Sequence, residues 1–441
     1  MLGEAKSARA ARRAAVLIGL LVLVGAGSTA TAQMKNRPDP ILIQGHELPA
    51  LNRTPIARLG VYAYRNGFDP IPFQVDERDR LNQWVLRAGP FAGRDADGGA
   101  LDENDELVFM AFDMDGRAPA NTKPPGATAC FEAQAGDGSG SARAFAYVCS
   151  FPSPPALAKE DYAEFEGGPN SWLVKTPAYQ LGGKEGQSYF DLIKIAPPAG
   201  PFGPDLVDAQ KIRARVFLGE DRKIMQVTER NSATYTRGWC DGPVRVIRVR
   251  SGNLKIAALE ITIPGFANNY QYLSFFLIPL QFDLPLNANF IFRHVDYATT
   301  VDFSPEVFGW IYYDALSPSG LNVDGTMGPE EKAPASGAHK DWYALSGKGQ
   351  SVLFRIVMGP SWKGSMVPTQ FYLDDAASLD PPEEIPGATR FGFRLKTVSQ
   401  VPKGTHRYDL YGFFPGSYSE PARKRFFLPV DNPLQVEITA R

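Results

Sequence analysis

The chain has 441 residues, and its 46 basic and 48 acidic residues nearly cancel to a net charge of −2. This balance excludes the concentrated positive charge that binding to nucleic acid or to an anionic membrane requires. The length suffices for two or three domains, or for one very large domain with a sizeable core.

The first 32 residues have the three zones of a secretory signal peptide. Four basic residues precede an uncharged apolar run over residues 14–27, and a group of small residues ends at Ala32. The run is shorter than the roughly 20 residues that span a bilayer, so we expect cleavage near Ala32 rather than an uncleaved anchor. The mature protein would then be secreted or periplasmic, with no transmembrane segment.

Two of the three cysteines are placed to pair. Cys130 and Cys149 flank the turn-rich segment 136–141 almost symmetrically. If this segment is a hairpin, the two side chains face each other, and an oxidising compartment would allow them to form a disulfide. We predict that disulfide and expect Cys240 to be a buried free thiol.

Short runs of β-branched and aromatic residues recur along the chain, separated by many of its 42 glycines and 37 prolines. This pattern is typical of an all-β fold, and we predict a large β-sandwich or supersandwich, with a smaller N-terminal β domain as an option. In the clearest strand, over residues 244–250, apolar residues alternate with Arg245, Arg248 and Arg250, which predicts a solvent-facing row of arginines. One short helix is predicted over residues 155–166.

The Pro/Gly-rich segment 196–205 has the composition of a linker. We therefore expect a signal peptide over residues 1–32, an N-terminal β domain or first part of the sandwich over 33–195, and a C-terminal β-sandwich over 206–441. The polar segment 317–340 is long for a simple connection, which indicates a functional insertion. The oligomeric state is left open.

Six carboxylates lie within the twelve residues from Asp95 to Glu106. Carboxylates gathered on a glycine-containing loop are ligands that Ca²⁺ prefers, so a calcium site formed by Asp95, Asp97, Asp102 and Glu106 is one hypothesis. An acidic turn that hydrogen-bonds its own backbone is the alternative. No other cofactor is required by the sequence.

Short blocks of the sequence resemble a group of exported proteins. Residues 71–77 read IPFQVDE and residues 105–111 read DELVFMA, an order similar to the N-terminal module of uncharacterised secreted bacterial proteins. Some of those proteins are related to supersandwiches of the polysaccharide-lyase and mutarotase type, and residues 240–246, CDGPVRV, are similar to a strand entry in such supersandwiches. The resemblance implies a β-sandwich fold and carries over no catalytic residue.

Histidine is the usual general base or metal ligand near neutral pH, and the chain has only four. His294 and Asp296 lie two residues apart in a predicted strand, so their side chains would share one face as a candidate ligand-binding pair. A half-buried histidine that bonds to its strand neighbour is the alternative.

Aromatic residues flank the predicted strand 352–357. Trp342, Tyr343 and Trp362 have charged or glycine neighbours, and ring faces beside polar groups suit the apolar faces and hydroxyls of sugars. We predict that these rings are exposed and bind carbohydrate, with ordinary core packing as the alternative.

The sequence lacks a Walker A loop, a strand-coupled G-x-G-x-x-G, H-E-x-x-H, C-x-x-C and G-x-S-x-G. We therefore predict a secreted or periplasmic β-sandwich protein that binds an extracytoplasmic ligand, and we expect that ligand to be a carbohydrate. A polysaccharide lyase or sugar epimerase would instead need ionisable groups that converge in a cleft. A non-enzymatic envelope or extracellular assembly component would need an exposed apolar patch or an open sheet edge.

Overall fold

The computed structural model describes residues 34–93, 98–138, 142–187, 190–197, 200–218, 222–256, 259–284, 295–332, 341–362, 364–375, 389–397, 402 and 404–441. Within these ranges the fold is all-β and built of antiparallel sheets, which confirms the predicted class. No helix in the described part of the chain is both long and apolar enough to cross a membrane. The chain divides into two compact units.

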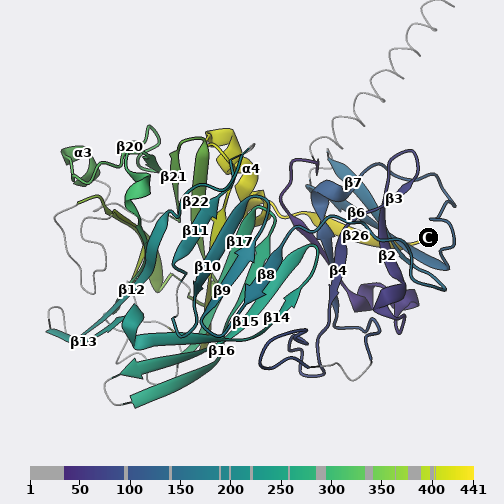
Figure 1. The fold of residues 1–441 in the computed structure, drawn as a ribbon, viewed down its shortest axis with the longest axis horizontal. Helices are drawn as coiled ribbons and strands as arrows, with labels where there is room; N and C mark the ends of the chain where they lie inside the picture. The colour runs from purple at the N-terminus through teal and green to yellow at the C-terminus, as the bar shows by residue number, and fades with distance from the viewer. Residues whose placement is uncertain are drawn as a thin grey trace, which may run out of the picture. The chain divides into compact units, whose positions relative to one another are not determined.

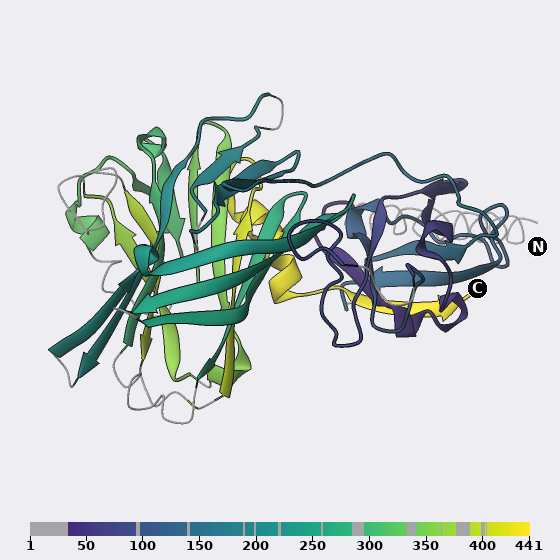
Figure 2. The same ribbon diagram turned by 60° about the horizontal axis from the view of Figure 1, so that its bottom comes forward.

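The first unit comprises the described residues within 34–84, 98–160 and 424–441. Its strands are β1 Pro40–Gln44, β2 Leu59–Tyr64, β3 Phe68–Pro70, β4 Phe73–Asp76, β5 Glu106–Met110, β6 Ala129–Gly136, β7 Arg143–Ser150 and β26 Gln435–Ala440. One sheet has the order β1-β5-β4 and the other the order β26-β6-β7-β2-β3. The yellow C-terminal strand β26 lies beside the blue strand β6 (Figure 1, Figure 2).

Both sheets of the first unit contribute to one hydrophobic core. Ile43 of β1, Leu107 of β5 and Val148 of β7 are buried in it. Cys130 of β6 lies directly opposite Cys149 of β7, and the two form a disulfide, as predicted from their spacing around the turn.

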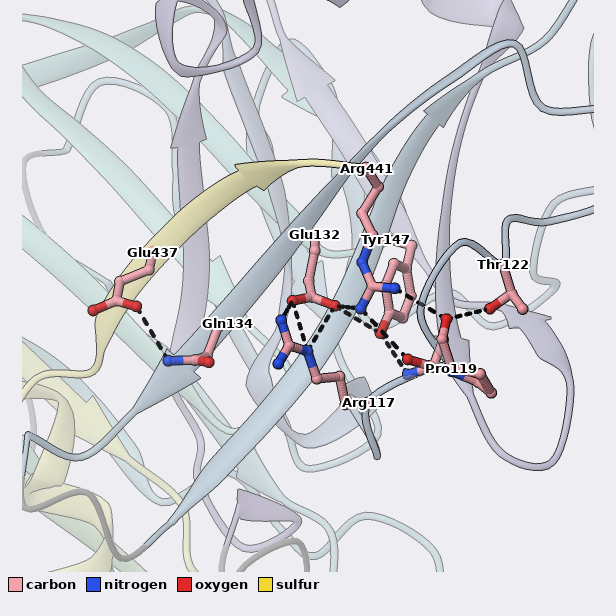
Figure 3. A network of polar contacts seen from close by, with 9 residues as sticks. Arg117, Pro119, Thr122, Glu132, Gln134, Tyr147, Glu437 and Arg441 are labelled. Carbon is pink, nitrogen blue, oxygen red and sulfur yellow. Dashed lines mark hydrogen bonds and ion pairs between the residues drawn. The ribbon is translucent and has the colours of Figure 1, made fainter.

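The last residue of the chain binds β26 to the β6–β7 hairpin (Figure 3). Arg441 forms an ion pair with Glu132, which also accepts hydrogen bonds from Arg117 at 3.0 Å and from the Tyr147 hydroxyl at 3.1 Å. The Arg441 backbone N–H donates to the Cys130 carbonyl at 2.9 Å. Burial raises the pKa of Glu132, but the hydrogen bonds from Arg117, Arg441 and Tyr147 outweigh burial and lower the pKa overall. An ionised carboxylate therefore helps to hold the C-terminal strand.

The second unit comprises the described residues within 85–93 and 161–423. Its sheets have the orders β11-β10-β9-β8, β13-β12-β18-β24-β23 and β14-β15-β16-β17-β25-β22-β21-β19-β20. The strands are β8 Glu164–Gly167, β9 Ser171–Lys175, β10 Tyr179–Lys184, β11 Leu192–Ile195, β12 Val207–Leu218, β13 Arg222–Thr228, β14 Ser232–Asp241, β15 Arg245–Ile256, β16 Leu259–Tyr272, β17 Phe275–Leu284, β18 Val295–Phe303, β19 Ile311–Asp314, β20 Leu321–Asn322, β21 Trp342–Gly347, β22 Gln350–Met358, β23 Met366–Leu373, β24 Arg390–Thr397 and β25 Gly404–Phe413. Helix α3 is Pro329–Lys332, and helix α4, Glu420–Asp431, carries the chain back to the first unit.

The four-stranded sheet packs on the inner face of the nine-stranded sheet. The Tyr179 ring of β10 lies 6.4 Å from that of Phe276 in β17 and stacks at 4.2 Å on Phe414. Figure 1 shows β8 to β11 in front of β14 to β17. Phe391 and Phe393 of β24 belong to the same core, so three sheets enclose one apolar interior, as in a sandwich.

Two features differ from the sequence-based expectation. The helix expected over residues 155–166 is absent: residues 155–163 form no helix and are mostly exposed, and residues 164–166 belong to strand β8, whose Phe165 is buried in the core of the second unit. The boundary expected near residues 196–205 falls inside the second unit, since β8 to β11 pack on that unit's core. The final segment 424–441 returns to the first unit, where β26 pairs with β6.

The arginines of β15 are buried, so the expected solvent-facing row is wrong. Arg245, Arg248 and Arg250 are 1%, 0% and 5% exposed. Val246 and Ile247 point to opposite faces of the strand and are both 0% exposed, so both faces of the sheet are covered here. Cys240 in the adjacent strand is a buried thiol outside the disulfide, as expected, and it donates to the Val85 carbonyl at 3.3 Å.

Loss of the disulfide should destabilise the first unit. The bridge joins residues 19 positions apart, and a closed loop of this length restricts the unfolded chain by about 3 kcal/mol. We expect Cys130→Ala/Cys149→Ala to lower the free energy of unfolding of this unit by that amount, measured by urea denaturation. Cys240→Ala should leave the same transition unchanged. Equal thiol labelling of the wild type before and after reduction would contradict the bridge.

Loss of the Glu132 charge should destabilise the first unit at neutral pH. We expect Glu132→Gln to lower its free energy of unfolding by about 2 kcal/mol at pH 7, because charged hydrogen bonds to Arg117 and Arg441 are weakened. The folded-state pKa lies below the usual 4.5, so this stabilisation is present above pH 4.5 and is lost as the pH falls through the folded-state pKa. Denaturation at several pH values should show the variant and the wild type converging in acid. The exposed Glu437 in β26 provides the control, since Glu437→Gln should change stability by less than about 0.5 kcal/mol.

Candidate ligand-binding groove

A groove of about 380 Å³ lies in the second unit, where the chain passes from β22 of the nine-stranded sheet to β23 of the five-stranded sheet. We call it the β22 groove. The crossing begins at Gly359, whose N–H donates to the Arg407 carbonyl at 2.9 Å. A Cβ at Gly359 would lie 2.7 Å from that oxygen, so a larger residue would displace the turn. The apolar walls of the groove are Ile356, Val357, Met358, Trp362, Met366 and Val367.

Trp362 contributes a buried wall of the β22 groove. It is 2% exposed, its indole N–H donates to the Arg407 carbonyl at 2.9 Å, and its ring lies 4.5 Å from the His406 ring. His406 is itself 1% exposed, with Nε2 at 2.7 Å from the Pro402 carbonyl oxygen. These contacts fix the indole in place, so Trp362 shapes the groove but does not offer an open ring face.

Asp341 and Arg355 form an ion pair at the edge of the groove, with 3.2 Å between Arg355 Nη2 and Asp341 Oδ2. The Arg355 side chain is 13% exposed and that of Asp341 is 41% exposed, so the carboxylate is open to solvent. Arg355 lies directly between Trp342 and Tyr411 of the adjacent strands, and such residues share one face of a sheet. Burial and then the charge of Asp409 raise the pKa of Tyr411 to about 12, so its phenol stays protonated at neutral pH.

The expectation that Trp342 and Tyr343 are exposed is wrong. Trp342 is 8% exposed, and the Arg423 guanidinium carbon lies 4.5 Å from its ring centroid. Tyr343 points to the opposite face, is 1% exposed and stacks on Phe354 at 5.1 Å. The alternative of core packing therefore describes Tyr343, and a cation–π contact explains the burial of Trp342.

The other predicted pair is only partly described. His294 lies outside the described residues. Asp296 lies in β18, opposite Arg215 of β12 and Lys396 of β24. The pairing of His294 with Asp296 at a ligand therefore stays a prediction.

The acidic segment 95–106 of the first unit is also only partly described. Asp95 and Asp97 lie outside the described residues. Asp102 accepts the Asn104 N–H at 3.1 Å, and Glu106 forms an ion pair with Arg78 at 2.6 Å. No group of three or more metal-binding side chains is found among the residues that the structure describes. Calcium binding by this segment stays a prediction, which thermal melting with EDTA and then with added Ca²⁺ would test.

Beside the acidic segment is a wider hollow of about 750 Å³, lined by polar and charged residues that include Arg53, Arg80, Asp102 and Glu103. Asp105 lies close by, is 0% exposed and accepts backbone N–H groups from Arg78 and Asp102, both at 2.9 Å. Burial raises the pKa of Asp105 to about 7, against the lowering effect of these hydrogen bonds. Asp105 therefore orders the turn through hydrogen bonds to the backbone, which is the alternative to a calcium site given above for this segment.

The sequence-based search missed Asp341 and Arg355. One signal was present, because Arg355 is the only charged residue in an otherwise apolar run over residues 352–358. An isolated arginine in such a strand needs a partner or a polar surface. The position of Asp341, which follows the undescribed residues 333–340, had no comparable signal.

No protein-family model matches the chain, and no curated protein sequence matches it. Among solved structures, the YidC insertase crystal structure with its first transmembrane domain resolved matches with 8% identity and a TM-score of 0.24. That match covers 62% of this chain and 45% of the insertase chain, so the chain spans less than half of that protein. The crystal structure of HI1317 matches with 7% identity and a TM-score of 0.27, over 57% of this chain and 99% of the other. At these TM-scores the likeness carries no argument about fold or function.

Proposed function

We propose that the mature chain is an exported protein that binds a carbohydrate in the β22 groove. The observation that carries the proposal is the combination of apolar walls with one accessible ion pair, Asp341–Arg355, in a space of about 380 Å³. Small-molecule sites commonly have volumes of this order, with apolar linings and few polar groups. A sugar offers apolar C–H surface to such walls and hydroxyls to a carboxylate and a guanidinium.

Two observations support a location outside the cytoplasm. The N-terminal residues have the charge and hydropathy pattern of a signal peptide. The first unit contains the Cys130–Cys149 disulfide, and structural disulfides belong mainly to proteins that fold in oxidising compartments.

Binding explains the described lining better than catalysis does. A lyase or epimerase needs a general acid and a general base within reach of its substrate. The described lining offers one carboxylate, that of Asp341, and His406 is packed behind Trp362. We therefore propose carbohydrate binding as the function, with a carbohydrate-active enzyme as the alternative.

Variants of the groove test the proposal. We expect a glycan array to identify a ligand for the wild type, and isothermal titration calorimetry to give its affinity. Asp341→Asn should weaken binding about tenfold, because it removes a charged acceptor for hydroxyls and keeps the shape of the groove. Val367→Trp should abolish binding, because the larger side chain fills the groove.

Asp69→Asn is the matched control, since Asp69 is an exposed carboxylate of the first unit. It should leave the affinity unchanged. Full binding by a folded Val367→Trp variant would place the sugar elsewhere. A wild type that binds no glycan of neutral or acidic type would refute the proposed function.

A further inference from the structure

The inner face of β15 and β16 carries a polar patch inside the second unit. Arg248 of β15 lies directly opposite Asn269 of β16, and Gln271 is two residues further along β16, so the three side chains share one face. The Arg248 guanidinium carbon lies 4.0 Å from the centroid of the Trp172 ring in β9. The patch is therefore enclosed between the nine-stranded sheet and the four-stranded sheet that covers it.

Several polar atoms of this patch have no hydrogen-bond partner in the part of the chain that the structure describes. They are Arg248 Nη1, Asn269 Oδ1 and both amide atoms of Gln271. The three residues are 0%, 1% and 0% exposed. Buried polar groups are almost always hydrogen-bonded in native proteins, and an unsatisfied one destabilises the fold. Four such atoms on one face point to a bound group that completes their hydrogen bonds.

The charges around the patch favour a negative group. The Glu185 carboxylate accepts a hydrogen bond from Arg248 Nη2 at 3.1 Å and another from the Thr236 N–H at 2.8 Å. Burial lowers the pKa of Arg248, as does the positive charge of Arg250, and Glu185 acts against both effects. Burial likewise lowers the pKa of Arg250 to about 10, again opposed by Glu185. One carboxylate thus acts on two buried guanidinium groups, and a second negative charge would be stabilised beside them.

We propose that this patch is a closed binding site for a small hydroxylated carboxylate, of the kind that glycolate and lactate represent. The carboxylate would accept hydrogen bonds from Arg248 Nη1 and the Gln271 amide nitrogen. The hydroxyl would donate to Asn269 Oδ1 or to the Gln271 amide oxygen. Gln271 offers one donor and one acceptor in either orientation of its amide, so the match does not depend on that assignment. The site is separate from the β22 groove and does not rest on the carbohydrate proposal.

The experiment compares four small probes on the full mature chain. Glycolate and lactate carry both groups, acetate carries only the carboxylate, and propane-1,2-diol carries only hydroxyls. We expect glycolate or lactate to raise the melting temperature of the second unit by about 5 °C at a hundredfold excess over its Kd. Acetate should give a smaller shift, and propane-1,2-diol should give none. Isothermal titration calorimetry should show one site.

The variant Gln271→Leu tests whether the hydroxy acid binds at this patch. The variant removes two unpaired polar atoms, so the melting temperature without ligand should stay the same or rise, while the glycolate or lactate shift should be lost. Gln281→Leu is the control, because Gln281 is exposed in the next strand, and it should keep the shift. Gln271→Met provides a second variant if the branched side chain does not fit.

Three outcomes would overturn the inference. If neither hydroxy acid shifts the wild type and Gln271→Leu is more stable, the patch holds internal water only. If propane-1,2-diol matches glycolate, no carboxylate is recognised. If Val367→Trp loses the shift and Gln271→Leu keeps it, the acid binds in the β22 groove, and the inference fails while the groove proposal stands.

Discussion

The inner face of the nine-stranded sheet has to be shielded from water, and a separate four-stranded sheet shields it. Tyr179 of β10 meets Phe276 of β17 in that contact, and β24 closes the same core from the third sheet. Because the three sheets enclose one core, the chain crosses between them, as it does from β22 to β23. The β22 groove forms at one such crossing, where the strand ladder ends and a short turn begins. The polar patch at Arg248 lies where the four-stranded sheet packs on polar and charged residues of the nine-stranded sheet instead of on apolar ones.

The sequence predicted the fold class well because strand signals are local. Runs of β-branched residues between turns, and two cysteines around one turn, depend on neighbours that are close in the chain. The exposure of a strand face depends on distant residues. In β15 the alternation of arginines with apolar residues indicated a wet face, but Trp172 of β9 covers Arg248. The residues next to Arg248 in the sequence do not indicate that the ring of Trp172, 76 positions earlier, covers it.

The candidate site was predicted in part. The aromatic residues around residues 352–357 directed attention to a segment that lines the β22 groove, and Trp362 forms one of its walls. Their exposure was misjudged because an aromatic residue next to polar neighbours in sequence can still point inward, as Tyr343 does. Asp341 and Arg355 become neighbours only through the pairing of β21 with β22. That register is a tertiary property, so the pair was not visible in the sequence.

The pairing of β26 with β6 has a consequence for the order of folding. The first unit holds the earliest described residues of the chain, yet its five-stranded sheet lacks an edge strand until residues 435–440 arrive. During synthesis, the described strands of the second unit, β8 to β25, are all made before β26 completes the first unit. The earlier strands of this sheet must therefore wait in an incomplete form, with β6 unpaired on one side, until residues 435–440 are released.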